Sequence, residues 1–154
     1  MNVLESAEEL QSKKLSFSPA AMAEYQTLAR ATRRILHLSL DSFRQDDPVQ
    51  AAQVEPLEQV IDTLKEELRT RHILRMRQGQ CSIEAGFVWA DLLTDLERTS
   101  DHCSNIAGCV IDARAHNLNL HETLRQAKTA DGSFQQTYES YVEKYQLPVP
   151  SSNV

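Results

Sequence analysis

Apolar residues recur at the three-to-four-residue spacing of α-helices along most of the chain. Ser18-Pro19 predicts the start of a first long helix, because Ser accepts a hydrogen bond from unpaired helix N–H groups and Pro fits the first helical position. We expect this helix to end near Asp46. Its predicted apolar stripe consists of Met22, Tyr25, Ala29, Leu36, Leu40 and Phe43.

Asp47-Pro48 repeats the start signal and predicts a second long helix. Pro56 lies inside its pattern, so it either kinks this helix or marks the true start. Gly79 is the expected stop, because helices often end at a glycine. The apolar stripe of this helix is Leu57, Ile61, Leu64 and Leu68.

Ser82 is the expected cap of a third helix that runs to about His116. At roughly 35 residues this helix is about 50 Å long, and it must pack along most of that length to cover its apolar face. The residues of that face are Phe87, Trp89, Leu92, Leu93, Leu96, Ile106, Ala107, Val110 and Ile111.

The C-terminal part predicts a short helix from Asn119 to Lys128 and a further one opened by Ser133. Aromatic residues at helical spacing mark the last helix: Phe134, Tyr138, Tyr141 and Tyr145. The expected fold is therefore all-α, an antiparallel three-helix bundle with a short C-terminal helical annex. We divide the chain into a short N-terminal segment (1–16), one helical domain (17–147) and a disordered tail (148–154).

Composition narrows the class of function. The 22 acidic residues outnumber the 16 Lys and Arg, and this excess disfavours nucleic-acid and anionic-lipid binding unless the basic residues cluster. Three cysteines without a C-x-x-C motif indicate neither a disulfide framework nor a zinc finger. No apolar stretch approaches the roughly 20 residues of a membrane span, and the N-terminus lacks a signal peptide. We expect a cytoplasmic protein.

Paired carboxylates are the main candidate chemistry. Glu58 and Asp62 on the second helix, and Glu97 and Asp101 on the third, share E-x-x-x-D spacing, which puts each pair on one helix face. On helical wheels at about 100° per residue, both pairs lie at the same offset from their apolar stripe. All four side chains are therefore expected to converge on one groove beside the helix–helix seam.

Converging carboxylates repel one another, and either protonation or a bound cation relieves the repulsion. Hard multivalent cations prefer oxygen ligands, so the set suits a multinuclear iron, manganese or magnesium site. The alternative is a solvated flank with arginine counter-charges. The candidate counter-charges are Arg69, Arg71, Arg75 and Arg98.

Other features favour plainer interpretations. Asp91 and Asp95, and the basic run from Lys65 to Arg77, are expected to be solvated, and Cys103 on the apolar stripe is expected to be a buried free thiol. No histidine follows a glutamate at the Glu-x-x-His spacing of di-iron oxidases. G-x-S-x-G, P-loop and G-x-G-x-x-G motifs are absent.

The run D-L-L-T-D-L-E-R-T-S-D-H-C-S-N-I-A (Asp91–Ala107) resembles the signature helix of the PhoU family. Upstream, V-E-P-L-E-Q-V-I-D-T-L (Val54–Leu64) is similar to that family's E-x-x-I-D segment. The stretch between them, Arg71–Leu93, resembles the PhoU-like C-terminal cytoplasmic domains of sodium/phosphate cotransporter family proteins. The resemblance covers about residues 18–148.

This resemblance implies an all-helical protein that controls phosphate transport by binding partner proteins and is not an enzyme. It also implies that Glu58, Asp62, Glu97 and Asp101 are metal ligands, because PhoU-like proteins use E-x-x-x-D motifs to hold multinuclear clusters, often of iron. The expected partner is a phosphate transporter or a transport-regulating protein, at the inner face of the membrane.

The chain departs from the family pattern in two respects, since it contains one full three-helix repeat and no transporter helices. An uncovered repeat surface favours self-association, and we expect a homodimer. Two other functions stay open: a metal-free helical dimerisation or interaction module, and a metal-dependent hydrolase of phosphate compounds, which would need an open coordination position.

Overall fold

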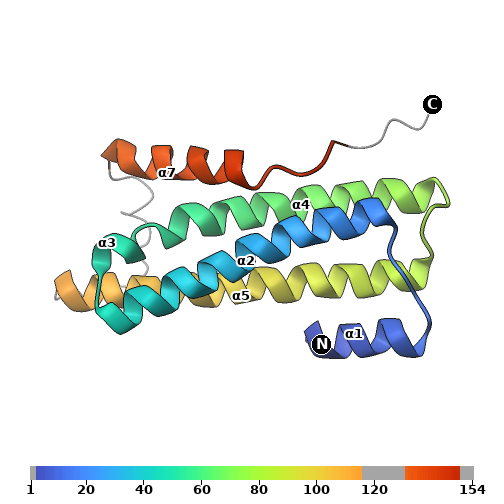
Figure 1. The fold of residues 1–154 in the computed structure, drawn as a ribbon, viewed down its shortest axis with the longest axis horizontal. Helices are drawn as coiled ribbons and strands as arrows, with labels where there is room; N and C mark the ends of the chain where they lie inside the picture. Colours follow the sequence, from blue (N-terminus) through green and yellow to red (C-terminus); the bar gives the residue numbers. More distant parts are fainter. Residues whose placement is uncertain (1–2, 116–130, 150–154) are drawn as a thin grey trace.

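The computed structural model describes residues 3–115 and 131–149, and this part of the chain folds into α-helices as predicted (Figure 1). The helices are α1 (Val3–Ser12), α2 (Pro19–Gln45), α3 (Pro48–Ala51), α4 (Val54–Arg77), α5 (Ile83–Ala115) and α7 (Asp131–Lys144). Helices α2, α4 and α5 form the antiparallel three-helix bundle, with α7 beside α4 and α1 beside α5. None of these helices is both long enough and apolar enough to cross a bilayer.

The predicted capping signals set the ends of α2. Ser18 Oγ accepts a hydrogen bond from the Ala21 N–H at 3.2 Å, which satisfies one N–H group of the first turn. Asp46 ends the helix in the left-handed region at φ 52°. Asp47 then caps α3 by accepting from the N–H groups of Val49 and Gln50.

The two alternatives for Pro56 resolve in favour of a helix start. The short α3 ends at Ala51, and α4 begins at Val54, so Pro56 lies in the first turn of α4. N–H groups in the first turn have no intrahelical acceptor, so the missing N–H of proline costs no hydrogen bond there. At the other end of α4, Gly79 adopts φ +69°, a conformation that glycine accepts without strain. Ser82 Oγ accepts from the Ala85 N–H and caps α5, as expected.

The apolar faces of α4 and α5 are confirmed as the core. Leu57, Ile61 and Leu68 of α4 are fully buried, and so is Trp89 of α5. Phe87 is an exception, because its side chain is 68% exposed. The predicted end of α5 near His116 and the expected helix from Asn119 to Lys128 lie outside the described residues.

The predicted stripe of α2 is correct only at Tyr25 and Ala29, which are half-buried and pack against the core cluster. The helix buries a neighbouring face, led by Leu28, Ile35 and Leu38. The other residues of the predicted stripe are exposed: Met22, Leu36, Leu40 and Phe43. Small and hydroxyl side chains complete the buried face, and these allow close approach to α4 and α5 without a row of large apolar residues. They are Ala21, Thr27, Ala31, Thr32, Ser39 and Ser42.

The aromatic stripe of the annex is confirmed. Tyr141 and Tyr145 of α7 are buried in the core cluster, and α7 packs on α4. Leu147 continues this contact after the helix ends. The N-terminal segment forms α1, which packs on α5, and Ser6 of this helix is buried.

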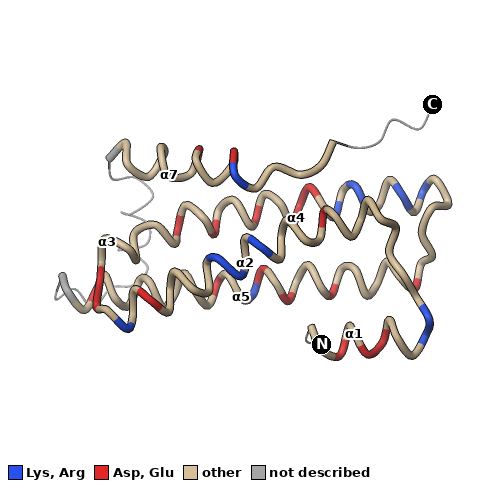
Figure 2. The backbone as a smooth tube through the Cα atoms, viewed as in Figure 1, with Lys and Arg blue, Asp and Glu red and all other residues tan. Residues whose placement is uncertain are grey.

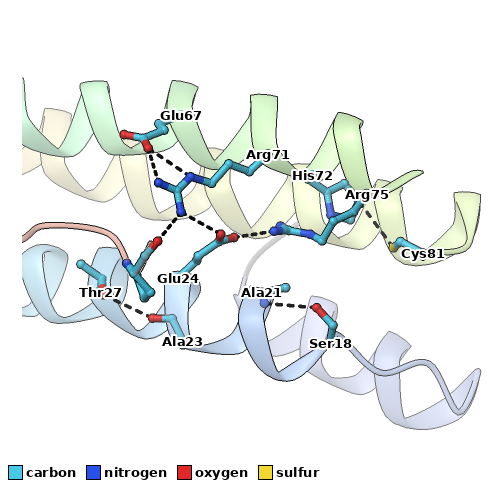
Figure 3. A network of polar contacts seen from close by, with 11 residues as sticks. Ser18, Ala21, Ala23, Glu24, Thr27, Glu67, Arg71, His72, Arg75 and Cys81 are labelled. Carbon is cyan, nitrogen blue, oxygen red and sulfur yellow. Dashed lines mark hydrogen bonds and ion pairs between the residues drawn. The ribbon is translucent and has the colours of Figure 1, made fainter. Parts of the chain in front are cut away.

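A buried acid joins α2 to α4 and corrects the expectation of a solvated basic run. Glu24 Oε1 lies 3.1 Å from Arg71 Nη1, and Glu24 Oε2 lies 2.7 Å from Arg75 Nη1 (Figure 3). The Arg75 guanidinium also lies 5.6 Å from the ring centroid of Trp89. Two arginines of the run are therefore held inside the bundle. Figure 2 shows that basic residues gather in the C-terminal half of α4 and in the middle of α2.

We expect Glu24→Gln to lower the free energy of unfolding by about 3 kcal/mol, because it leaves two desolvated guanidinium groups without their carboxylate. Urea denaturation at pH 7 measures this change. Glu67→Gln is the control, because Glu67 pairs with Arg71 from a side chain that is 47% exposed. Glu67→Gln should lower the free energy of unfolding by less than about 1 kcal/mol. Similar small losses in both variants would contradict a structural role for Glu24.

Candidate metal site

Three of the four predicted carboxylates come together at the α4–α5 seam. Glu58 and Asp62 of α4 and Asp101 of α5 each offer one oxygen, and these three atoms all lie within 4.8 Å of one another. The antiparallel packing of α4 on α5 produces this meeting, since both pairs flank their apolar stripes at the same offset. Glu58 is 9% exposed.

Glu97 does not join this group. Its Oε1 lies 2.8 Å from Lys65 Nζ, and the two side chains are equally half-buried. The expectation that all four carboxylates converge is wrong on this point, because Lys65 of α4 reaches across the seam and binds Glu97. Helical wheels place carboxylates on a face, but they do not show which cation the facing helix offers.

The predicted arginine counter-charges are found only in part at the group. Arg71 and Arg75 bind Glu24 at the α2 interface, and Arg69 lies 4.0 Å from the exposed Glu66. The cations that act on the carboxylates include Arg98, as predicted, and Lys65, which was not predicted. Asp91 and Asp95, expected to be solvated, are half-buried and lie outside the group.

Burial and a neighbouring acid both disfavour the charged form of Asp101. Burial raises the pKa of Asp101 above its usual value of 3.8, and the neighbouring charge of Glu97 raises it further. Lys65, His102 and Arg98 lower the pKa but do not offset these two effects. A cation that bound the group would favour the charged form of Asp101.

Two buried acids along the same helices were not among the predicted site residues. Glu55 precedes Glu58 by one turn of α4, is buried and accepts a hydrogen bond from the Ser104 hydroxyl of α5. Asp112 is buried further along α5. The V-E-P-L-E run contained a signal for Glu55, because residues i and i+3 share a helix face. Asp112 carried no comparable signal.

The donor set consists of oxygen atoms and suits a hard cation. Bonds from oxygen to Mg²⁺ or Ca²⁺ are about 2.0–2.6 Å long, so three oxygens within 4.8 Å of one another can contact one ion or bridge two. Cys103 is a buried free thiol as predicted, and it does not belong to the group.

The same part of the chain carries the relationship to known proteins. The PhoU domain model matches residues 25–110, which span α2 to most of α5 and include all four predicted carboxylates. The chain belongs to the PhoU family. A curated relative, "Phosphate-specific transport system accessory protein PhoU homolog 1" of Thermotoga maritima, is 27% identical over 124 residues.

That alignment covers 80% of this chain and 52% of the relative, so the PhoU-family chain spans about half the length of the protein it matches. No solved structure matches the chain. The predicted family and the all-α fold are thus confirmed.

We expect Asp101→Asn to stabilise the metal-free protein by about 0.5 kcal/mol at pH 7, because it removes one of two repelling charges at i, i+4. The raised pKa means that the folded state binds a proton at Asp101 more readily than the unfolded state does. The charged form of Asp101 therefore lowers the free energy of unfolding, and this loss grows as the pH rises above 3.8. Urea denaturation in chelator at pH 7 and pH 4 measures the difference. The stabilisation of Asp101→Asn relative to the wild type should be smaller at pH 4. A variant less stable than the wild type at pH 7 would contradict an unfavourable charge at Asp101.

Proposed function

We propose that this chain is a non-enzymatic regulatory domain of phosphate transport that binds a transport partner and holds metal at Glu58, Asp62 and Asp101. The observation that carries the proposal is the meeting of these three carboxylates inside the segment matched by the PhoU domain. Iron is the first candidate because the resemblance implies it, and manganese and magnesium share its preference for oxygen ligands.

The metal's proposed role is mechanical. An ion bound between Glu58, Asp62 and Asp101 would connect α4 to α5 and offset the negative charge that these three carboxylates gather at the seam. Both helices would then be held in one register. Glu97 and Lys65 lie beside this position, and their ion pair already supplies part of the same connection in the metal-free protein.

The exposed face of α2 supports partner binding. Leu36, Leu40 and Phe43 are exposed there, and Arg33 and Arg44 lie among them. Apolar residues with adjacent arginines are typical of protein-binding surfaces. The name of the Thermotoga relative assigns that protein to a phosphate-specific transport system, which supports a transport component as the class of partner. The cotransporter-type partner and the homodimer stay predictions.

We expect Asp62→Asn combined with Asp101→Asn to abolish metal binding while leaving helicity intact, because two of three ligand carboxylates are replaced by amides of equal size. Elemental analysis of protein purified without chelators measures iron, manganese and magnesium per chain. Asp91→Asn is the matched control on α5 and should keep the wild-type content. Unchanged metal in the double variant would exclude these ligands.

Regulation of phosphate transport predicts a second result. In cells that lack this chain, uptake of radiolabelled phosphate should change, and expression of the wild-type chain should restore it. If metal fixes the bundle for partner binding, the Asp62→Asn and Asp101→Asn double variant restores it poorly. Full restoration by the double variant would favour the metal-free interaction module. Uptake unaffected by loss of the chain would exclude the proposed function.

A further inference from the structure

A second group of potential ligands lies at the α4–α5 turn, ten residues or about 15 Å along α4 from Asp62. His72 and Met76 belong to the last turns of α4, and Cys81 lies in the turn itself. Gly86 of α5 faces them. We call these four residues the hairpin cluster. The proposed phosphate-transport function makes no use of them.

In the hairpin cluster, His72 lies near two sulfur donors, the Cys81 thiol on one side and the Met76 thioether across the Gly86 position. Cys81 Sγ lies 3.7 Å from His72 Nε2 (Figure 3). A Cβ atom built on Gly86 would lie 2.7 Å from Met76 Sδ and 3.3 Å from His72 Nε2. The thioether and the imidazole therefore border the same small space, and that space exists because residue 86 has no side chain.

The separation of sulfur and nitrogen matches that of two ligands on one ion. With the bond lengths that zinc makes, about 2.3 Å to thiolate and about 2.0 Å to imidazole, tetrahedral or trigonal angles separate the two ligand atoms by roughly 3.5–3.7 Å. In the metal-free protein the same separation accommodates a thiol–imidazole hydrogen bond. The donors would need little movement to bind.

His72 is prepared as a neutral ligand. Its side chain stacks on Trp89 with 5.3 Å between ring centroids, and the residue is 3% exposed. Burial lowers the pKa of His72, the charge of Arg75 lowers it further and that of Glu24 raises it, so the surroundings as a whole favour the neutral imidazole. Among the described residues, its Nδ1 has no hydrogen-bond partner.

An open pocket borders part of the hairpin cluster. The pocket, of about 450 Å³, lies between α4 and α5 and is lined by His72, Met76, Gly86 and Trp89. Most of its other walls are apolar, with exposed Ile73 and Phe87 at the surface, and Lys65 and Arg69 are the cationic residues that line it. Hard cations keep their water in such a setting, whereas a soft cation exchanges it for sulfur ligands.

We propose that the hairpin cluster binds Cu(I) through the Cys81 thiolate, His72 Nε2 and the Met76 thioether. A monovalent ion on one thiolate leaves the cluster neutral, which suits its position beside the Arg75 cation; a divalent ion would add net positive charge there. Binding releases the thiol proton of Cys81 to solvent and changes no oxidation state. The ligand types separate this site from the carboxylate group at the seam.

Anaerobic titration of the full chain with Cu(I), against a chromogenic Cu(I) chelator, tests the proposal. The wild type should withdraw one Cu(I) per chain from the chelator and develop ultraviolet thiolate-to-copper absorption. Cys81→Ser should lose both signals, and Met76→Leu should bind at least about tenfold more weakly. Cys109→Ser is the control, because this exposed free cysteine lies elsewhere on α5.

Gly86→Ala gives a second variant that does not depend on removing a ligand. Alanine favours the helix, so the fold is retained, but the added methyl group displaces Met76 Sδ from the shared space. Its affinity for Cu(I) should fall like that of Met76→Leu. Equal affinity in the wild type and Cys81→Ser, or no competition with the chelator by the wild type, would overturn the proposal.

Discussion

The apolar seam between α4 and α5 is the constraint on which the rest of the molecule depends. Leu57, Ile61 and Leu68 pack in one core cluster with Trp89 and Leu93, and this contact sets the register of the two helices. Because side chains on a helix have fixed directions, the register also decides which polar groups meet along the edges of the seam. The carboxylates near its middle and the sulfur and imidazole donors at its turn follow from the same packing.

Sequence patterns were sufficient where a local physical rule determined the outcome. The caps at Ser18 and Ser82 and the stop at Gly79 depend on backbone hydrogen bonds and a positive φ, and both are properties of a few adjacent residues. The stripe of α2 could not be found in this way. Its buried face is rich in Ala, Ser and Thr, and only the shapes of α4 and α5 select that face over the more apolar one.

The candidate site also contains a part that helical spacing predicts and a part that it does not. Helical spacing predicts that Glu58, Asp62 and Asp101 share a seam, since that is a matter of angles on two neighbouring helices. It does not predict that Lys65 binds Glu97, nor that Glu24 of α2 holds Arg71 and Arg75. Ion pairs between helices depend on axial register and on how far long side chains reach, and neither is contained in the periodicity of one helix.

Arg71 also links the interior of the bundle to the end of the described chain. Its Nη1 donates to the backbone carbonyl of Pro148 as well as to Glu24. Tyr141 and Tyr145 belong to the core and Leu147 packs against it, so this surface contact fixes the chain just beyond them. The match to the domain model ends at residue 110, before α7. A chain cut at residue 110 would expose one side of α4 and deprive the half-buried Arg71 guanidinium of one of its acceptors.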